Sequence, residues 1–101
     1  MRIADITPPT AFKIAVEFPI PGAGKTSIDF TVRWRNKPAV VILLEKMKEM
    51  TDAQTLLEVV TGWELEDEVN AETITEFCDT FPQAPVVILT RYFKELGVSI
   101  A

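Results

Sequence analysis

A glycine-rich segment that ends in lysine and threonine is the first place where the sequence could hold a reactive ligand. Gly22-Ala23-Gly24-Lys25-Thr26 matches the end of a phosphate-binding loop. Such a loop also needs a glycine five positions before Gly24, where this chain has Pro19, and a helix after the lysine. The residues after Lys25 alternate between apolar and polar, which is typical of a strand. The segment therefore predicts a hairpin turn rather than a nucleotide site.

An acidic run is the second candidate, because carboxylates are the ligands that Ca²⁺ prefers. It consists of Glu64, Glu66, Asp67 and Glu68. The Asp-x-Asp-x-Asp-Gly spacing of a calcium loop and its turn glycine are missing. The run is better interpreted as solvated charge in a loop.

The third candidate is Cys78, the single cysteine. It falls on the apolar stripe of a predicted helix, and the chain has no histidine to activate it. A small buried hydrophobic residue is the expected role. No pair of carboxylates stands out for acid–base work either. We therefore expect a protein that is not an enzyme, with no catalytic residue, no cofactor and no metal site.

Charge and composition limit the partners. The net charge of −5 disfavours nucleic acid and anionic membrane surfaces, since both are bound through clustered lysine and arginine. The longest apolar run, residues 39–44, is far shorter than the ~20 residues that a spanning helix needs. A lone cysteine fits a reducing compartment. The sequence thus favours one cytoplasmic domain over residues 1–101, with residues 1–10 as a flexible lead-in around Pro8-Pro9.

Two alternating segments give the clearest structural prediction. Over 11–19 and 25–35 every second residue is apolar, and a proline- and glycine-containing turn joins them. This pattern predicts an antiparallel β-hairpin. The side chains expected on its inner face are Phe12, Ile14, Val16, Phe18, Ile28, Phe30, Val32 and Trp34.

Four short helices are predicted after the hairpin, so the fold class is α+β: an N-terminal antiparallel β-hairpin followed by about four helices packed as a small bundle. The expected helices are 39–50; a second one from an N-cap at Thr51, with Gln54 in the capping-box position, to Gly62; 70–81, capped by Asn70; and 85–96, closed by Gly97. For residues 39–44 a strand is the alternative, because Val40-Val41-Ile42 is β-branched. The charges that follow Leu44 at helical spacing favour the helix.

The layout from Leu56 to Leu96 also resembles the tail assembly chaperones of long-tailed bacteriophages. The residues that carry this resemblance are the Gly62-Trp63 junction after a helix, the acidic run, and a late aromatic pair, Tyr92-Phe93. The resemblance implies a phage or prophage protein that binds the tape measure protein, keeps it soluble and helps to recruit tail-tube subunits, without catalysis. It also implies action in the host cytoplasm and absence from the mature virion.

Three residues are predicted as partner-binding anchors: Val41, Trp63 and Tyr92. Each lies at the edge of its apolar stripe, and Trp and Tyr are frequent at binding hot spots. Residues 39–44 are apolar on all sides, which suggests self-association or the capture of an amphipathic helix. Two classes of function stay open: an assembly chaperone, or a small structural tail or neck subunit of the virion or another phage-encoded interaction module.

Overall fold

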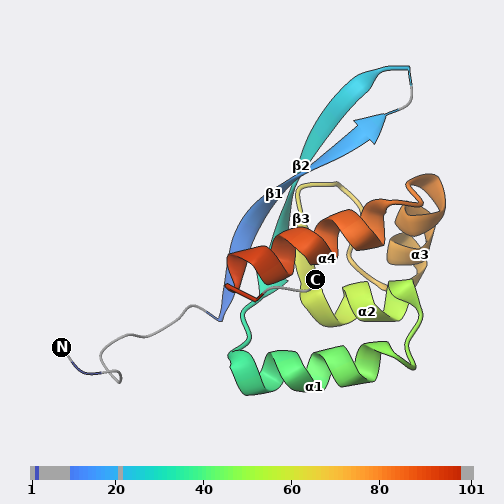
Figure 1. Cartoon of the computed structure of the whole chain (residues 1–101). Coiled ribbons are helices and arrows are strands. Elements are labelled where there is room, and N and C mark those ends of the chain that lie inside the picture. The colour runs from blue at the N-terminus through green and yellow to red at the C-terminus, as the bar shows by residue number, and fades with distance from the viewer. Residues whose placement is uncertain (1, 3–9, 21, 99–101) are drawn as a thin grey trace.

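A computed structural model describes residues 2, 10–20 and 22–98 of the chain. It has the predicted α+β architecture, with a hairpin, a short third strand and four helices (Figure 1). The predicted flexible lead-in over residues 1–10 lies mostly outside the described residues. In chain order the elements are β1 (Ala11–Ile20), β2 (Gly24–Arg33), α1 (Lys37–Met47), α2 (Asp52–Val59), β3 (Val60–Trp63), α3 (Ala71–Thr80) and α4 (Ala84–Glu95).

The predicted hairpin is confirmed, and its register brings the apolar positions of both strands to one face. β1 pairs antiparallel with β2, from Ala11 opposite Arg33 to Ile20 opposite Gly24. Gly22 and Gly24 have φ of 78° and 86°, a backbone conformation that glycine adopts without a steric penalty. Six of the predicted inward side chains are buried: Ile14, Val16, Phe18, Ile28, Phe30 and Val32. Phe12 is partly buried, and Trp34 is half-buried just beyond the end of β2.

The structure contradicts the prediction that the second helix continues to Gly62. α2 ends at Val59, and Val60 already has an extended backbone with φ −88° and ψ 122°. Val60–Trp63 instead forms β3, which pairs antiparallel with the free edge of β2, with Gly62 opposite Thr31. Two physical causes favour a strand rather than a helix at residues 60–63. The edge of β2 offers unpaired backbone groups, and β-branched residues lose side-chain freedom in a helix and fit a strand well.

The helix boundaries follow from capping side chains that the sequence makes visible. The Asn36 side chain accepts a hydrogen bond from the backbone N–H of Ala39 at 3.0 Å, so residues 39–44 are helical, and the alternative strand is wrong. Thr51 with Gln54, and Asn70 with Thr73, form two reciprocal capping boxes.

α4 ends in a Schellman motif. Gly97 has φ 78°, and the N–H of Val98 donates to the carbonyl of Phe93 at 2.8 Å. This confirms the prediction that Gly97 closes the fourth helix.

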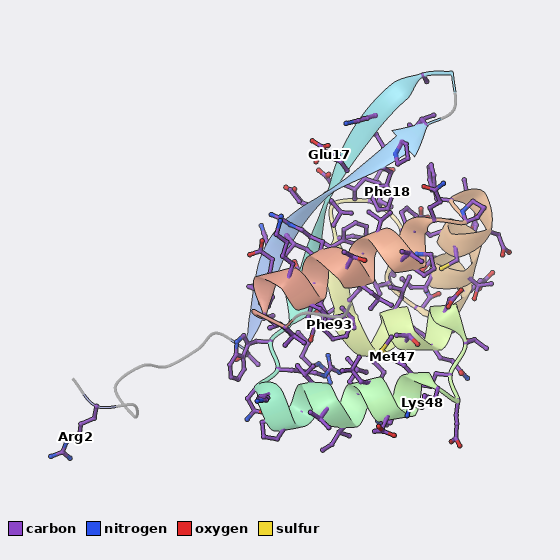
Figure 2. The ribbon with its side chains drawn as sticks, in the orientation of Figure 1. Arg2, Glu17, Phe18, Met47, Lys48 and Phe93 are labelled. Carbon is purple, nitrogen blue, oxygen red and sulfur yellow. The ribbon has the colours of Figure 1, made fainter. Side chains whose placement is uncertain are left out.

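The helices cover one face of the sheet, and the core lies between the two layers. Figure 2 shows Phe18 and Phe93 pointing inward, and Glu17 and Lys48 pointing outward. Phe18, Phe30 and Phe77 form an aromatic cluster, with ring centroids 5.6–6.0 Å apart. α1 lies farther from the sheet than α2, and the turn end of the hairpin extends beyond the helices (Figure 1).

Candidate partner-binding surfaces

The glycine-rich segment forms the turn and the first residues of β2. Lys25 points outward from the strand, and its Nζ lies 4.0 Å from a carboxylate oxygen of Glu17 across the hairpin. No helix N-terminus follows the lysine, because β2 continues to Arg33. The geometry is therefore that of a hairpin turn, and the motif lacks the helix that a phosphate-binding loop requires.

In the described part of the chain, neither the acidic run nor Cys78 has the arrangement typical of a reactive site. Among residues 2, 10–20 and 22–98, no three side chains of the types that ligate metals converge. Glu64 is tied to β2, since its carboxylate accepts from the N–H of Asp29 at 2.9 Å. Cys78 is half-buried on α3. Burial, and then the nearby charges of Asp52 and Asp79, raise the pKa of its thiol. A raised pKa lowers the fraction of reactive thiolate, so this cysteine fits the predicted packing role better than a nucleophilic one.

Tyr92, the third predicted anchor, has a fully buried side chain. Its ring stacks against Phe12 with centroids 6.4 Å apart. Its hydroxyl donates to the carbonyl of Arg33 at 2.7 Å and accepts from the guanidinium of Arg35 at 2.9 Å. Arg35 also donates to the carbonyl of Glu58 at 2.7 Å. Tyr92 thus joins α4 to the end of β2, and through Arg35 to α2, and it offers no surface to a partner in this conformation.

Val41 lies on an exposed apolar face of α1. Val41 and Ile42 are 51% and 61% exposed, whereas Val40 and Leu43 on the opposite face are buried. Val41 also borders an open hollow of about 470 Å³ between the start of α1 and the end of α4. The residues that line this hollow are Arg35, Lys37, Val40, Val41, Leu44, Leu96, Gly97 and Val98. α1 therefore presents large apolar side chains to solvent, a feature of binding surfaces when such side chains gather.

Trp63 is half-buried at the end of β3 and holds the acidic loop against the core. Its indole N–H donates to the carbonyl of Asp67 at 2.6 Å. Its ring packs on Phe30 and Phe77, with centroids 6.3 and 5.6 Å away. The remaining edge of the indole is open on the side of α3, where it borders a hollow.

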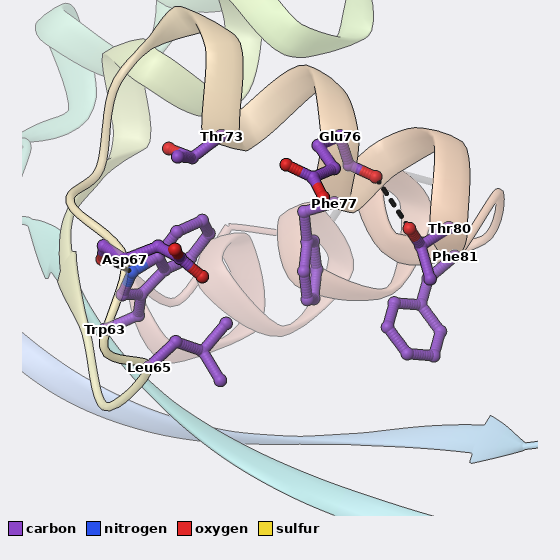
Figure 3. A pocket seen from close by; sticks show the side chains of 8 residues that line it. All are labelled: Trp63, Leu65, Asp67, Thr73, Glu76, Phe77, Thr80 and Phe81. Carbon is purple, nitrogen blue, oxygen red and sulfur yellow. Dashed lines mark hydrogen bonds between the residues drawn. The ribbon is translucent and has the colours of Figure 1, made fainter.

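We call this region the α3 groove; it consists of two adjacent hollows of about 120 and 130 Å³ that share Thr80 and Phe81. Figure 3 shows the first, with Trp63, Leu65 and Asp67 on one side and α3 on the other. Its lining is Trp63, Leu65, Asp67, Thr73, Glu76, Phe77, Thr80 and Phe81. The lining of the second is Phe18, Pro19, Thr80, Phe81, Pro82 and Gln83.

The sequence predicts a third helix that includes Phe81, and no groove beside it. The helix ends at Thr80, and Phe81 has left the helical conformation, with φ −123° and ψ 86°. Its ring then lies 5.2 Å from Phe77 and 6.0 Å from Phe18 and stays half-exposed. The Pro82 that follows Phe81 was the available signal, because a residue before proline is disfavoured in the α conformation.

Charge is distributed unevenly over the chain. Residues 59–90 contain no lysine or arginine, but they contain seven acidic residues: Glu64, Glu66, Asp67, Glu68, Glu72, Glu76 and Asp79. The rest of the chain holds all ten Lys and Arg residues against eight Asp and Glu. The acidic loop and α3, which border the α3 groove, therefore carry a strong negative potential.

These features define a class of protein: a small α+β domain with exposed apolar side chains on α1 and an open, acid-bordered groove beside α3, both suited to contact with other proteins. A family model described as phage tail assembly chaperone matches residues 1–98. The chain therefore belongs to the phage tail assembly chaperone family. No curated protein and no solved structure gives a significant match to it. Within the described part of the chain, no helix is long and apolar enough to cross a membrane.

Proposed function

We propose that this chain binds the tape measure protein of its phage or prophage, keeps that protein soluble and helps to recruit tail-tube subunits to it. The observation that carries the proposal is the match to the phage tail assembly chaperone family over residues 1–98. The role is protein–protein binding without catalysis. It takes place in the host cytoplasm during assembly, and the protein is absent from the finished virion.

Two of the predicted anchors support this function by their position. Val41, with Ile42, exposes apolar surface on α1, and Trp63 borders the α3 groove. Covering such surfaces with apolar side chains of a partner would remove both from water, which favours association. Val41 and Trp63 are therefore proposed as contact residues, whereas Tyr92 supports the fold through its contacts with the end of β2.

Coexpression with the cognate tape measure protein tests the proposal. The parent chain should keep the tape measure protein in the soluble fraction and copurify with it. Val41→Asp should weaken copurification, because it places a charge in the proposed contact. Thr90→Asp, which makes a similar change at an exposed position of α4, should not. A tape measure protein that stays insoluble with the parent chain would refute the proposed function.

Mass spectrometry of assembly intermediates and of purified particles tests whether the protein acts only during assembly and is absent from the finished virion. The chain should be present in intermediates and missing from particles. If it persists in finished particles at the copy number of a subunit, it is a structural component of the tail or neck instead.

A further inference from the structure

The α3 groove has a floor that is already assembled in the free protein. The rings of Trp63, Phe77 and Phe81 pack on one another, with centroids 5.6 Å apart for the first pair and 5.2 Å for the second. Phe77 also packs against the fully buried Phe18 and Phe30. Because these contacts belong to the core, little side-chain freedom remains to be lost when a ligand binds.

The size of the hollows sets what they can hold. They measure about 120 and 130 Å³, and Phe81 lines both. A cavity of roughly 150 Å³ accommodates benzene. Each hollow is somewhat smaller than that cavity but open to solvent on one side, so it can receive one apolar side chain, and the pair can receive two such side chains from a single segment.

The charge around the groove selects between possible segments. Asp67 and Glu76 are the ionisable residues among those that line it, and five further carboxylates lie on the same loop and helix. Like charges at an interface are costly, and opposite charges favour encounter and orientation. An apolar segment flanked by acidic residues would be repelled here, and one flanked by lysine or arginine would be attracted.

We propose that the α3 groove binds a basic amphipathic segment of a partner protein, with two bulky apolar side chains in the two hollows and flanking Lys or Arg residues near Asp67 and Glu76. The identification of this partner as the tape measure protein rests on the proposed function. The chemistry of the bound segment rests on the groove itself.

Thr80 offers a direct test, because it is exposed and lines both hollows. Thr80→Arg would fill the groove and place a positive charge in it. Thr90→Arg is the matched control, an exposed helical threonine on α4 away from the groove. The probes are two synthetic amphipathic peptides of leucine and alanine that differ only in carrying lysine or glutamate on the polar face.

Titration calorimetry should show the lysine peptide binding to the parent chain at least about tenfold more tightly than the glutamate peptide, with affinity falling as salt is added. Thr80→Arg should weaken binding of the lysine peptide by about tenfold or more. Thr90→Arg should leave it unchanged. Glu76→Lys should weaken it several-fold, while Glu49→Lys, an exposed reversal outside the groove, should have a smaller effect.

Equal affinity of the parent and Thr80→Arg for the lysine peptide would overturn the proposal, as would equal binding of the two peptides. A parent chain that self-associates, and that Thr80→Arg converts to a monomer in sedimentation experiments, would also overturn it, since a second copy would then fill the groove.

Coexpression separates this inference from the proposed function. If Thr80→Arg still holds the tape measure protein, the groove assignment is wrong and the function stands. If the lysine peptide binds in the groove but the parent chain does not keep the tape measure protein soluble, the groove stands and the function is wrong.

Discussion

At the scale of single residues, Tyr92 shows that a residue type frequent at interfaces can also serve the core. Trp and Tyr are frequent at interfaces because they combine a large apolar body with a polar tip, but the same combination suits a core position whose tip meets a backbone carbonyl. Its partners, Arg33 and Arg35, lie 59 and 57 residues earlier in the chain. Such distant pairings depend on how α4 packs on the sheet, chiefly on β1, and they cannot be inferred from the spacing of nearby residues.

Removing the Tyr92 hydroxyl should therefore destabilise the protein without opening the fold. We expect Tyr92→Phe to lower the free energy of unfolding by about 1–3 kcal/mol, since it leaves the carbonyl of Arg33 and one guanidinium nitrogen of Arg35 without that partner. Urea denaturation measures the change. As a control, Thr80→Val removes an exposed hydroxyl that donates to the carbonyl of Glu76, and should stay within about 0.5 kcal/mol of the parent. Equal effects of both variants would contradict the structural role of Tyr92.

At the scale of elements, the hairpin and the helix starts could be predicted, and β3 could not. The hairpin follows from strict alternation, and two helix starts follow from the capping residues Thr51 and Asn70. Residues 56–63 carry a helical pattern that runs into Gly62. The structure ends that helix at Val59, where the chain pairs with the edge of β2, from Val32 opposite Val60 to Phe30 opposite Trp63. Local helix propensity is a weak guide to structure where pairing with a strand edge competes with helix formation.

The two hollows of the α3 groove could not be predicted from the sequence either. They depend on how the acidic loop, β1 and α3 meet around Phe81. Trp63 could be singled out by its type, but its neighbours across the groove could not.

The hairpin carries much of the stability, and Phe30 is its most informative position. The side chain is fully buried and contacts the rings of Phe18, Trp63 and Phe77. Phe30→Ala should cost ~3–5 kcal/mol, because it leaves a cavity as well as losing buried surface. Val86→Ala truncates an apolar residue that is 69% exposed, and should have little effect. Denaturant unfolding of both variants gives the comparison; a Phe30→Ala protein within half a kcal/mol of the parent would show that this face is not core.

At the scale of the whole molecule, stability should be uneven. α1 has two fully buried side chains, Val40 and Leu43, and its outer face is exposed, whereas β2 is paired on both sides. Regions with few buried contacts open at lower free energy than the core. α1 is therefore the helix most free to adjust to a partner.

Hydrogen exchange checks this expectation. The amides of α1 should exchange through a partial opening that depends weakly on denaturant, while the hydrogen-bonded amides of β2 should exchange through global unfolding. Equal protection of α1 and β2 would mean that the domain opens as one unit.

The separation of charge along the chain has a consequence for how the molecule moves. With carboxylates concentrated on the acidic loop and α3, and every Lys and Arg elsewhere, the protein carries an electric dipole as well as a net charge. In the field of a charged body a dipole experiences a torque, so rotation is biased before any contact is made. Toward a positively charged object, the molecule turns its loop and α3 first. Because salt screens charges over a Debye length of ≈ 8 Å at physiological ionic strength, this orienting torque acts only when the two molecules are almost in contact.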